Sequence, residues 1–274
     1  MGGMKRPALG GFLATVCLIG LAAFSVPASG ASRVPGILPS TPSVTPAAGG
    51  GARLSSLPVL DPSAIGTRTN GRIFATAPGR GGYTCSGTAL NTPSRSVVLT
   101  AGHCIVEDGV WATRLRFVPA FDHGHRPFGT FHASSARVMA QWRLTESAAY
   151  DLGALIVRPG ARGRLANVVG ARGWVAGRSR RSGFQIFGYP AAALFGQELR
   201  TCAGVGLGSD PSSDPGPPAI PSRCDMAAGA SGGGWLVDGQ YLNGVTSYSY
   251  QGNPRRLFSP YFGAAAAAFL AGLP

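Results

Sequence analysis

Short apolar runs, each ended by glycine, proline or another turn residue, divide most of this chain and limit what it can fold into. Alternating and β-branched residues of this kind predict strands. The composition agrees, because 42 glycines and 22 prolines favour many short strands and tight turns over long helices. The sequence therefore predicts an all-β fold, with first-half strands at Gly71–Thr76, Tyr83–Leu90, Ser94–Thr100, Trp111–Pro119 and Gly129–Met139.

The second half of the chain repeats this pattern and ends in a helix. After a connection over 161–173, strands are predicted at Gly183–Pro190, Gly196–Val205, Trp235–Val237 and Tyr241–Tyr250. The alanine-rich stretch Gly263–Ala271 is the one segment that strongly predicts a helix.

The N-terminal region differs in composition from the rest of the chain. Lys5 and Arg6 precede an apolar run from Ala8 to Val26 and then small residues, which is typical of a secretory signal peptide. We assign residues 1–31 to it and expect a secreted, extracellular protein without a stable membrane anchor. Residues 32–70 are rich in proline, serine, glycine and alanine, which predicts a linker or pro-segment. The folded domain is predicted to cover 71–274.

The net charge of +13 makes the chain strongly basic, yet the pattern does not favour nucleic acid. Of the 24 basic residues only Lys5 is lysine, and no basic cluster is interleaved with aromatic residues. We expect no specific nucleic-acid partner. A basic surface instead favours anionic cell-wall polymers or acidic protein surfaces as partners.

The glycine-rich stretch from Cys224 to Trp235 contains one serine, Ser231. Glycines on both sides let the backbone adopt strained conformations and let a ligand approach closely. The amides of Gly229 and Ser231 can then point at one position, as a developing oxyanion requires. The alternative is a glycine-rich turn between two strands.

A second stretch, Val97–Cys104, ends in a histidine that can serve as a base. A serine hydroxyl is a weak nucleophile at neutral pH and needs such a base, and the base needs a third group to orient it. Asp151 lies at the start of the apolar strand Leu152–Val157, where its carboxylate can accept a hydrogen bond from His103. The candidate catalytic residues are therefore His103, Asp151 and Ser231.

These two stretches resemble the chymotrypsin-fold, or trypsin-like, serine peptidases. The resemblance rests on Thr-Ala-Gly-His-Cys at 100–104 and Gly-x-Ser-Gly-Gly at 229–233, and it covers roughly 71–270. Cys224–Asp225 and the strand end Phe187–Pro190 resemble the bacterial branch that includes glutamyl endopeptidases. The resemblance implies two packed six-stranded antiparallel β-barrels, at 71–160 and 174–274, with a short C-terminal helix packed on the second barrel.

The resemblance also implies a reaction. Ser231 would attack a peptide carbonyl, His103 would accept its proton, Asp151 would orient the imidazole, and the amides of Gly229 and Ser231 would form the oxyanion hole. Ser247 matches a serine that supports the aspartate. The implied protein is a monomeric serine endopeptidase, a hydrolase that acts on polypeptides through an acyl-enzyme and needs no cofactor.

The cysteines and histidines allow two further expectations. Once Cys17 leaves with the signal peptide, an even number of cysteines remains, which predicts disulfides but not their pairing. The resemblance implies the pairs Cys85–Cys104 and Cys202–Cys224. A metal site at His123 and His125, with Asp122 beside them and His132 further on, is the alternative to a solvated loop. Because the neighbouring glycines and proline indicate a loop, we predict no metal site.

Three residues bear on substrate preference. Asp225 precedes Ser231 by the offset at which trypsin-like members carry a specificity aspartate, but here it follows Cys224. Thr246 occupies the position of a histidine in glutamyl endopeptidases, and Tyr248 is a further pocket candidate. We therefore expect a pocket without sharp acidic preference and with Asp225 outside its base.

Two departures from the family pattern keep a second class of function open. Ala230 replaces the aspartate that pairs with a new amino terminus in animal digestive members, and Gly234 replaces the usual proline. The alternative is a catalytically silent cationic binding protein on the same fold.

Overall fold

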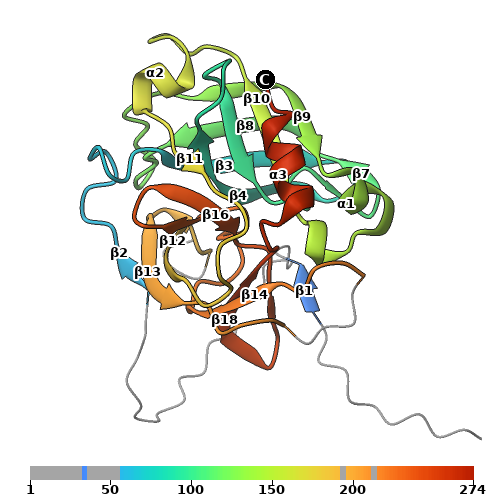
Figure 1. Ribbon diagram of the computed structural model, residues 1–274. Coiled ribbons are helices and arrows are strands. Elements are labelled where there is room, and N and C mark those ends of the chain that lie inside the picture. The colour runs from blue at the N-terminus through green and yellow to red at the C-terminus, as the bar shows by residue number, and fades with distance from the viewer. Residues whose placement is uncertain (1–32, 36–55, 192–195, 211–214) are drawn as a thin grey trace, which may run out of the picture. The chain divides into compact units, whose positions relative to one another are not determined.

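The computed structural model describes residues 33–35, 56–191, 196–210 and 215–274 (Figure 1). The predicted signal peptide and most of the predicted linker lie outside the described residues. None of the helices in the described part of the chain has the length and apolar character needed to cross a membrane.

The first half forms the predicted six-stranded antiparallel barrel, which closes in the order β10-β5-β4-β3-β8-β9. Alternate side chains of each strand point inward, and the interior includes Ile73, Val98, Phe117, Phe131 and Leu155. A small hairpin of β6 and β7 leads into β8, so the predicted strand at 111–119 is divided in two. The strands are β3 (Asn70–Ala77), β4 (Gly81–Leu90), β5 (Val97–Thr100), β6 (Val106–Glu107), β7 (Val110–Trp111), β8 (Thr113–Pro119), β9 (Phe131–Val138) and β10 (Gly153–Val157).

The second half is built from two sheets. A six-stranded sheet has the order β11-β16-β15-β12-β13-β2, and a four-stranded sheet has the order β1-β17-β18-β14. The chain passes from one sheet to the other between β16 and β17, through Thr246 and Ser247. A β-bridge between Gly206, which follows β13, and Ser222 of β14 also connects the two sheets. These strands are β11 (Gly173–Trp174), β12 (Gly183–Gly188), β13 (Arg200–Val205), β14 (Ile220–Arg223), β15 (Gly234–Val237), β16 (Tyr241–Val245), β17 (Tyr248–Tyr250) and β18 (Asn253–Ser259).

Two short strands from the predicted linker join this second half, which corrects the expectation that ordered structure begins near Gly71. β2 (Leu57–Pro58) pairs with β13, and β1 (Arg33–Pro35) pairs antiparallel with β17. Both strands lie at sheet edges, where main-chain atoms supply the contacts. Such pairing needs no apolar periodicity, so the sequence gives no sign of it.

The predicted C-terminal helix is present as α3 (Ala264–Ala271), but the prediction that it packs on the second barrel is wrong. Its Ala266 and Leu270 belong to one apolar cluster with Met139 and Trp142. Arg137 of β9 donates a hydrogen bond of 3.0 Å to the carbonyl of Gly272. Figure 1 shows α3 in red beside β9 and α1. The other helices are α1 (Ala140–Thr145), the 3₁₀ turn η1 (Ala148–Tyr150) and α2 (Leu165–Val169).

Candidate active site

His103 and Asp151 meet because two neighbouring barrel strands end at the same place. β5 and β10 are antiparallel, with Thr100 opposite Gly153, so the residues after Thr100 and before Gly153 lie at one end of the barrel. Asp151 Oδ2 lies 2.7 Å from Nδ1 of the His103 ring, and Asp151 Oδ1 accepts the His103 main-chain N–H at 2.8 Å. The carboxylate therefore fixes both the position and the ring orientation of the histidine.

Ser247 completes the surroundings of the Asp151 carboxylate. Its hydroxyl donates a hydrogen bond to Asp151 Oδ2, and its main-chain N–H donates one of 2.8 Å to the carbonyl of Phe258. Asp151 is 2% exposed, and a carboxylate at such a site requires hydrogen bonds to remain charged. The predicted supporting serine is thus in contact with the aspartate.

The two buried groups shift each other's titration. Burial alone would lower the pKa of His103, but the charge and hydrogen bond of Asp151 outweigh it and hold that pKa above its usual value. Burial alone would raise the pKa of Asp151, whereas His103 and the hydrogen bonds from His103 and Ser247 hold it below its usual value. The pair favours an imidazolium beside a carboxylate, the state that a base reaches after accepting a proton.

Ser231 is held beside this pair through its main chain. The carbonyl of Ser231 accepts the N–H of Ser86 at 2.7 Å and lies 3.7 Å from Sγ of Cys104. Its side chain makes no hydrogen bond to the His103 ring, since the buried Nε2 of His103 has no partner among the described residues. The ring is therefore held at Nδ1 and unpaired at Nε2.

The amides of Gly229 and Ser231 are oriented by bonds to the carbonyls that precede them. The carbonyl of Ala228 accepts the N–H of Ala191 at 2.6 Å, and that of Ala230 accepts the N–H of Gly233 at 2.9 Å. Because C=O and N–H point in opposite directions across a trans peptide, each bond fixes the direction of the N–H that follows it. Within the described residues neither amide donates a hydrogen bond, so both can receive an anion.

The conformation at Gly229 needs a glycine. Its φ is +92°, and a Cβ there would lie 2.6 Å from the carbonyl oxygen of Tyr189. Any other residue would therefore have to displace backbone and lose the orientation of this amide.

Ser86, on β4, is a site residue that sequence reasoning missed. Its hydroxyl donates to the carbonyl of Gly229 at 2.8 Å and accepts the N–H of Tyr189 at the same distance. Its main-chain N–H binds Ser231. Ser86 thus connects the first barrel to the loop that carries Ser231.

Replacing Ser86 with alanine is expected to lower kcat about tenfold with little change in KM. Complete loss of an oriented oxyanion donor costs about 10²- to 10³-fold, and this variant only loosens the position of the Gly229 amide. Two buried polar groups would lose their partner, so the free energy of unfolding should fall by about 1 to 3 kcal/mol. Steady-state kinetics and thermal unfolding measure the two effects.

Thr88→Val provides the matched control for this prediction. Thr88 lies two residues away on the same strand, is buried, and donates its hydroxyl to Asn70 at 3.0 Å. This variant should lose stability but keep kcat. An equal fall of kcat in both variants would show that Ser86 has only a structural role.

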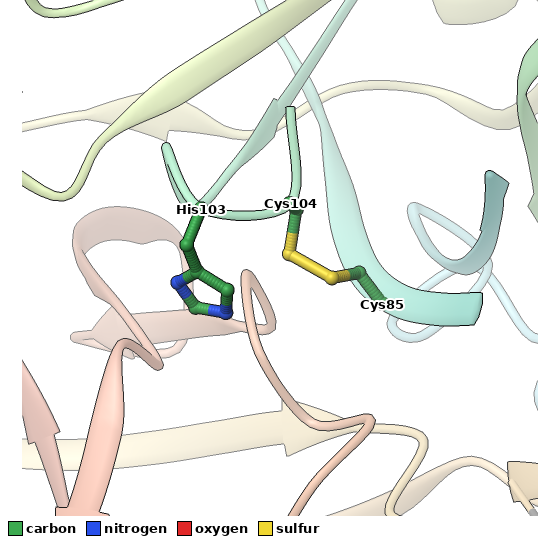
Figure 2. A group of neighbouring side chains, drawn as sticks. All are labelled: Cys85, His103 and Cys104. Carbon is green, nitrogen blue, oxygen red and sulfur yellow. A yellow bond between two sulfur atoms is a disulfide. The ribbon is translucent and has the colours of Figure 1, made fainter. Parts of the chain in front are cut away.

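Both predicted disulfides are confirmed, Cys85 with Cys104 and Cys202 with Cys224. Figure 2 shows the first of them beside the ring of His103. In the described part of the chain, Cys85, His103 and Cys104 form the one cluster of three potential metal ligands, but its two sulfurs are bonded to each other. A disulfide offers no thiolate to a metal ion.

The histidines weighed as metal ligands lie apart from this site. His123 Nδ1 contacts its neighbour Asp122 at 2.6 Å, and a bridge pairs Asp122 with His125 in a tight turn. His132 lies on β9 and is exposed.

The three pocket candidates have polar groups that are already engaged. Asp225 Oδ1 accepts the main-chain N–H of Ser56 at 2.7 Å, and Thr246 Oγ1 accepts the indole N–H of the buried Trp235 at 3.0 Å. The hydroxyl of Tyr248 donates to the carboxylate of Asp210. The structure therefore does not direct these three polar groups toward one ligand.

The two departures from the family pattern occupy tightly packed positions. Ala230 is fully buried, and a Cβ added at Gly188 would lie 2.9 Å from the Cβ of Ala230. A Cβ added at Gly234 would lie 2.6 Å from both Leu242 and Thr88. The small residues here permit close packing behind the serine loop.

Comparisons with known proteins agree with this geometry. No protein-family model matches the chain, and no curated protein matches it. Among solved structures, the protease Anisep from Arthrobacter nicotinovorans is 33% identical with a TM-score of 0.69, over 75% of this chain and 96% of that one. The thermostable serine protease AL20 from an extremophilic microorganism is 29% identical with a TM-score of 0.70, over 76% and 97%. A Glu endopeptidase, 19% identical with a TM-score of 0.64 over 78% and 94%, shares the fold.

Proposed function

Because this chain belongs to the chymotrypsin-fold serine peptidases, we propose that it is a secreted serine endopeptidase in which His103, Asp151 and Ser231 act as one unit. The observation that carries the proposal is the state of the His103 ring. Asp151 holds Nδ1, while the buried Nε2 has no partner among the described residues and the Ser231 loop is bound beside it. A buried polar atom without a hydrogen-bond partner costs free energy, and a catalytic role is one explanation for keeping it.

The proposed reaction is acyl transfer in two steps. Ser231 Oγ attacks the scissile carbonyl carbon, its proton moves to His103 Nε2, and the amides of Gly229 and Ser231 stabilise the oxyanion. His103 then donates the proton to the leaving amine as the C–N bond breaks, which leaves an ester on Ser231. In the second step water attacks this ester and gives its proton to His103. His103 returns that proton to Ser231 Oγ as the ester C–O bond breaks, which releases the acid and the free serine.

The two disulfides support the proposed export of the chain. Disulfides form and persist in oxidising compartments, and the first one lies next to the catalytic base. The proposed enzyme acts outside the cell as a monomer, where its basic charge favours contact with acidic proteins or anionic cell-wall polymers.

Labelling with a small serine-directed phosphonate tests this function. We expect one adduct per chain, mapped by mass spectrometry to the peptide that contains Ser231, and no adduct in Ser231→Ala. Unlabelled Ser231 in folded protein would favour the silent binding protein instead.

We further propose a substrate pocket without a dominant charged preference. Thr246 is neutral and its hydroxyl already binds Trp235, so it cannot supply the cation that strong selectivity for glutamate requires. Asp225 binds Ser56, which supports a place outside the base of the pocket. Medium polar or apolar residues before the scissile bond are the proposed substrates.

Asp225→Asn is therefore expected to leave the cleavage profile unchanged in a peptide library. The asparagine carbonyl can still accept the N–H of Ser56, so kcat/KM should change less than about threefold, in line with a net hydrogen-bond difference below about 1 kcal/mol. A profile dominated by arginine and lysine that disappears in this variant, or one dominated by glutamate, would contradict the proposed pocket.

A further inference from the structure

The strand that follows Ser247 is covered by a segment from near the start of the chain. β17 lies between β18 and β1, so without β1 it would be an edge strand. Arg33 lies opposite Tyr250, Val34 opposite Ser249 and Pro35 opposite Tyr248. Figure 1 shows β1 in blue beside strands of the C-terminal part of the chain.

The direction of β1 matters because of where β17 begins. Since the pairing is antiparallel, the chain runs from Arg33 to Pro35 toward the Ser247 end of β17. Ser247 donates to Asp151, which binds His103. An extended peptide bound along β17 in the direction of β1 therefore leads toward the proposed catalytic pair.

Recognition at such an edge depends mainly on the main chain. A strand edge offers N–H and C=O groups to any extended peptide, and side-chain pockets only refine the choice. A three-residue segment of the predicted linker can therefore compete with a substrate for this edge without resembling it in sequence.

We propose that Arg33–Pro35 occupies the surface along which an extended substrate binds, so that the unprocessed chain inhibits itself. This proposal rests on the proposed peptidase function. The segment directly follows the predicted signal peptide, so it would lie at the beginning of the exported precursor. A strand joined to its site by residues 36–55 competes at a local concentration of about millimolar.

The contacts of Ser56 indicate how processing would relieve the inhibition. The N–H of Ser56 binds Asp225, its hydroxyl accepts a hydrogen bond of 2.9 Å from Arg200 Nε, and Val59 N–H binds the carbonyl of Leu199 at 2.9 Å. These contacts hold the chain from Ser56 onward at the β13 edge of the six-stranded sheet. A cut between Pro35 and Ser56 would release β1 and leave β2 in place.

The test compares two double variants of the full exported chain. Arg33→Pro with Val34→Pro removes both main-chain N–H donors of β1, whereas Arg33→Ala with Val34→Ala keeps them. The measured quantity is kcat/KM for a peptide extended by several residues before the scissile bond, with intact mass confirming unprocessed chain. Labelling of Ser231 by a phosphonate without a peptide extension is followed in parallel.

We expect kcat/KM of the proline variant to exceed that of the alanine variant and of the parent by about tenfold. The reason is that a tethered strand at about millimolar local concentration inhibits by about this factor even when its own pairing with β17 is weak. The rate of phosphonate labelling should be equal in all three. Because added prolines can disturb folding, a second variant tests the release of β1 without them. It carries a recognition site for a sequence-specific protease within residues 36–55. Cutting the folded parent there should raise kcat/KM by a similar factor.

Equal kcat/KM in both double variants, together with no increase on cutting, would overturn the proposed inhibition. If Ser231 is still labelled in that case, the peptidase assignment stands. Absence of labelling in every form would overturn the peptidase function itself, and the inhibition with it.

Discussion

Replacing Ser231 with alanine is expected to lower kcat for peptide hydrolysis by about 10⁵- to 10⁶-fold, as the loss of a nucleophile does in other serine peptidases. The variant keeps His103 and Asp151 but has no oxygen to form the acyl ester. The main-chain contacts of Ser231 with Ser86 remain, so the melting temperature should stay close to that of the parent. Hydrolysis of a peptide substrate and thermal unfolding measure both quantities.

Ser134→Ala is the control for this substitution. It deletes the same oxygen from an exposed serine on β9 that donates a hydrogen bond to the carbonyl of Ile156. Its kcat should equal that of the parent. A Ser231→Ala enzyme that keeps more than a tenth of the parent activity would exclude Ser231 as the nucleophile.

Asp151→Asn is expected to lower kcat by about 10⁴-fold while leaving the fold intact. The asparagine can donate its N–H to His103 Nδ1, which would place the ring proton on Nε2, the atom that must accept the proton of Ser231. The buried charge that favours the imidazolium is lost as well. The variant therefore removes both the correct tautomer and the stabilisation of the protonated base.

The pH dependence distinguishes this electrostatic role from a structural one. His103 must be neutral to accept a proton, so kcat/KM of the parent should rise with pH through a pKa above the usual value of about 6.5. In Asp151→Asn the residual activity should rise at lower pH, because burial then opposes the charged imidazole without compensation. An unchanged acid limb would show that Asp151 does not set the titration of His103.

The parts of the site that could be predicted from the sequence lie in short local patterns. His103 and Ser231 each sit within a motif of five residues, and the strand after Asp151 is continuous in the sequence. The fold class followed from strand lengths and turns, and the disulfide pairing followed from the family resemblance. The motifs and the strand pattern depend on neighbours along the chain, whereas the cysteine pairing depended on the resemblance.

The features that were missed depend on contacts between distant segments. Ser86 looks like any serine on an alternating strand, but it contacts Gly229 and Tyr189, separated from it by 143 and 103 residues. The engagement of Thr246 by Trp235 and of Asp225 by Ser56 likewise appears only once the sheets are assembled. β1 and β2 bind through main-chain atoms, which carry no sequence signal. The contact between Arg137 of β9 and Gly272 at the end of α3 likewise joins segments 135 residues apart.

Trapping the acyl-enzyme tests the central proposal most directly. With an activated ester as substrate, deacylation limits the rate, so mixing should release a burst of close to one equivalent of leaving group per chain. Quenching in acid and digestion should then locate the acyl group on Ser231, with no burst in Ser231→Ala or in His103→Ala. An acyl group on another residue, or a burst that survives loss of Ser231, would contradict the account in which His103, Asp151 and Ser231 act as one unit.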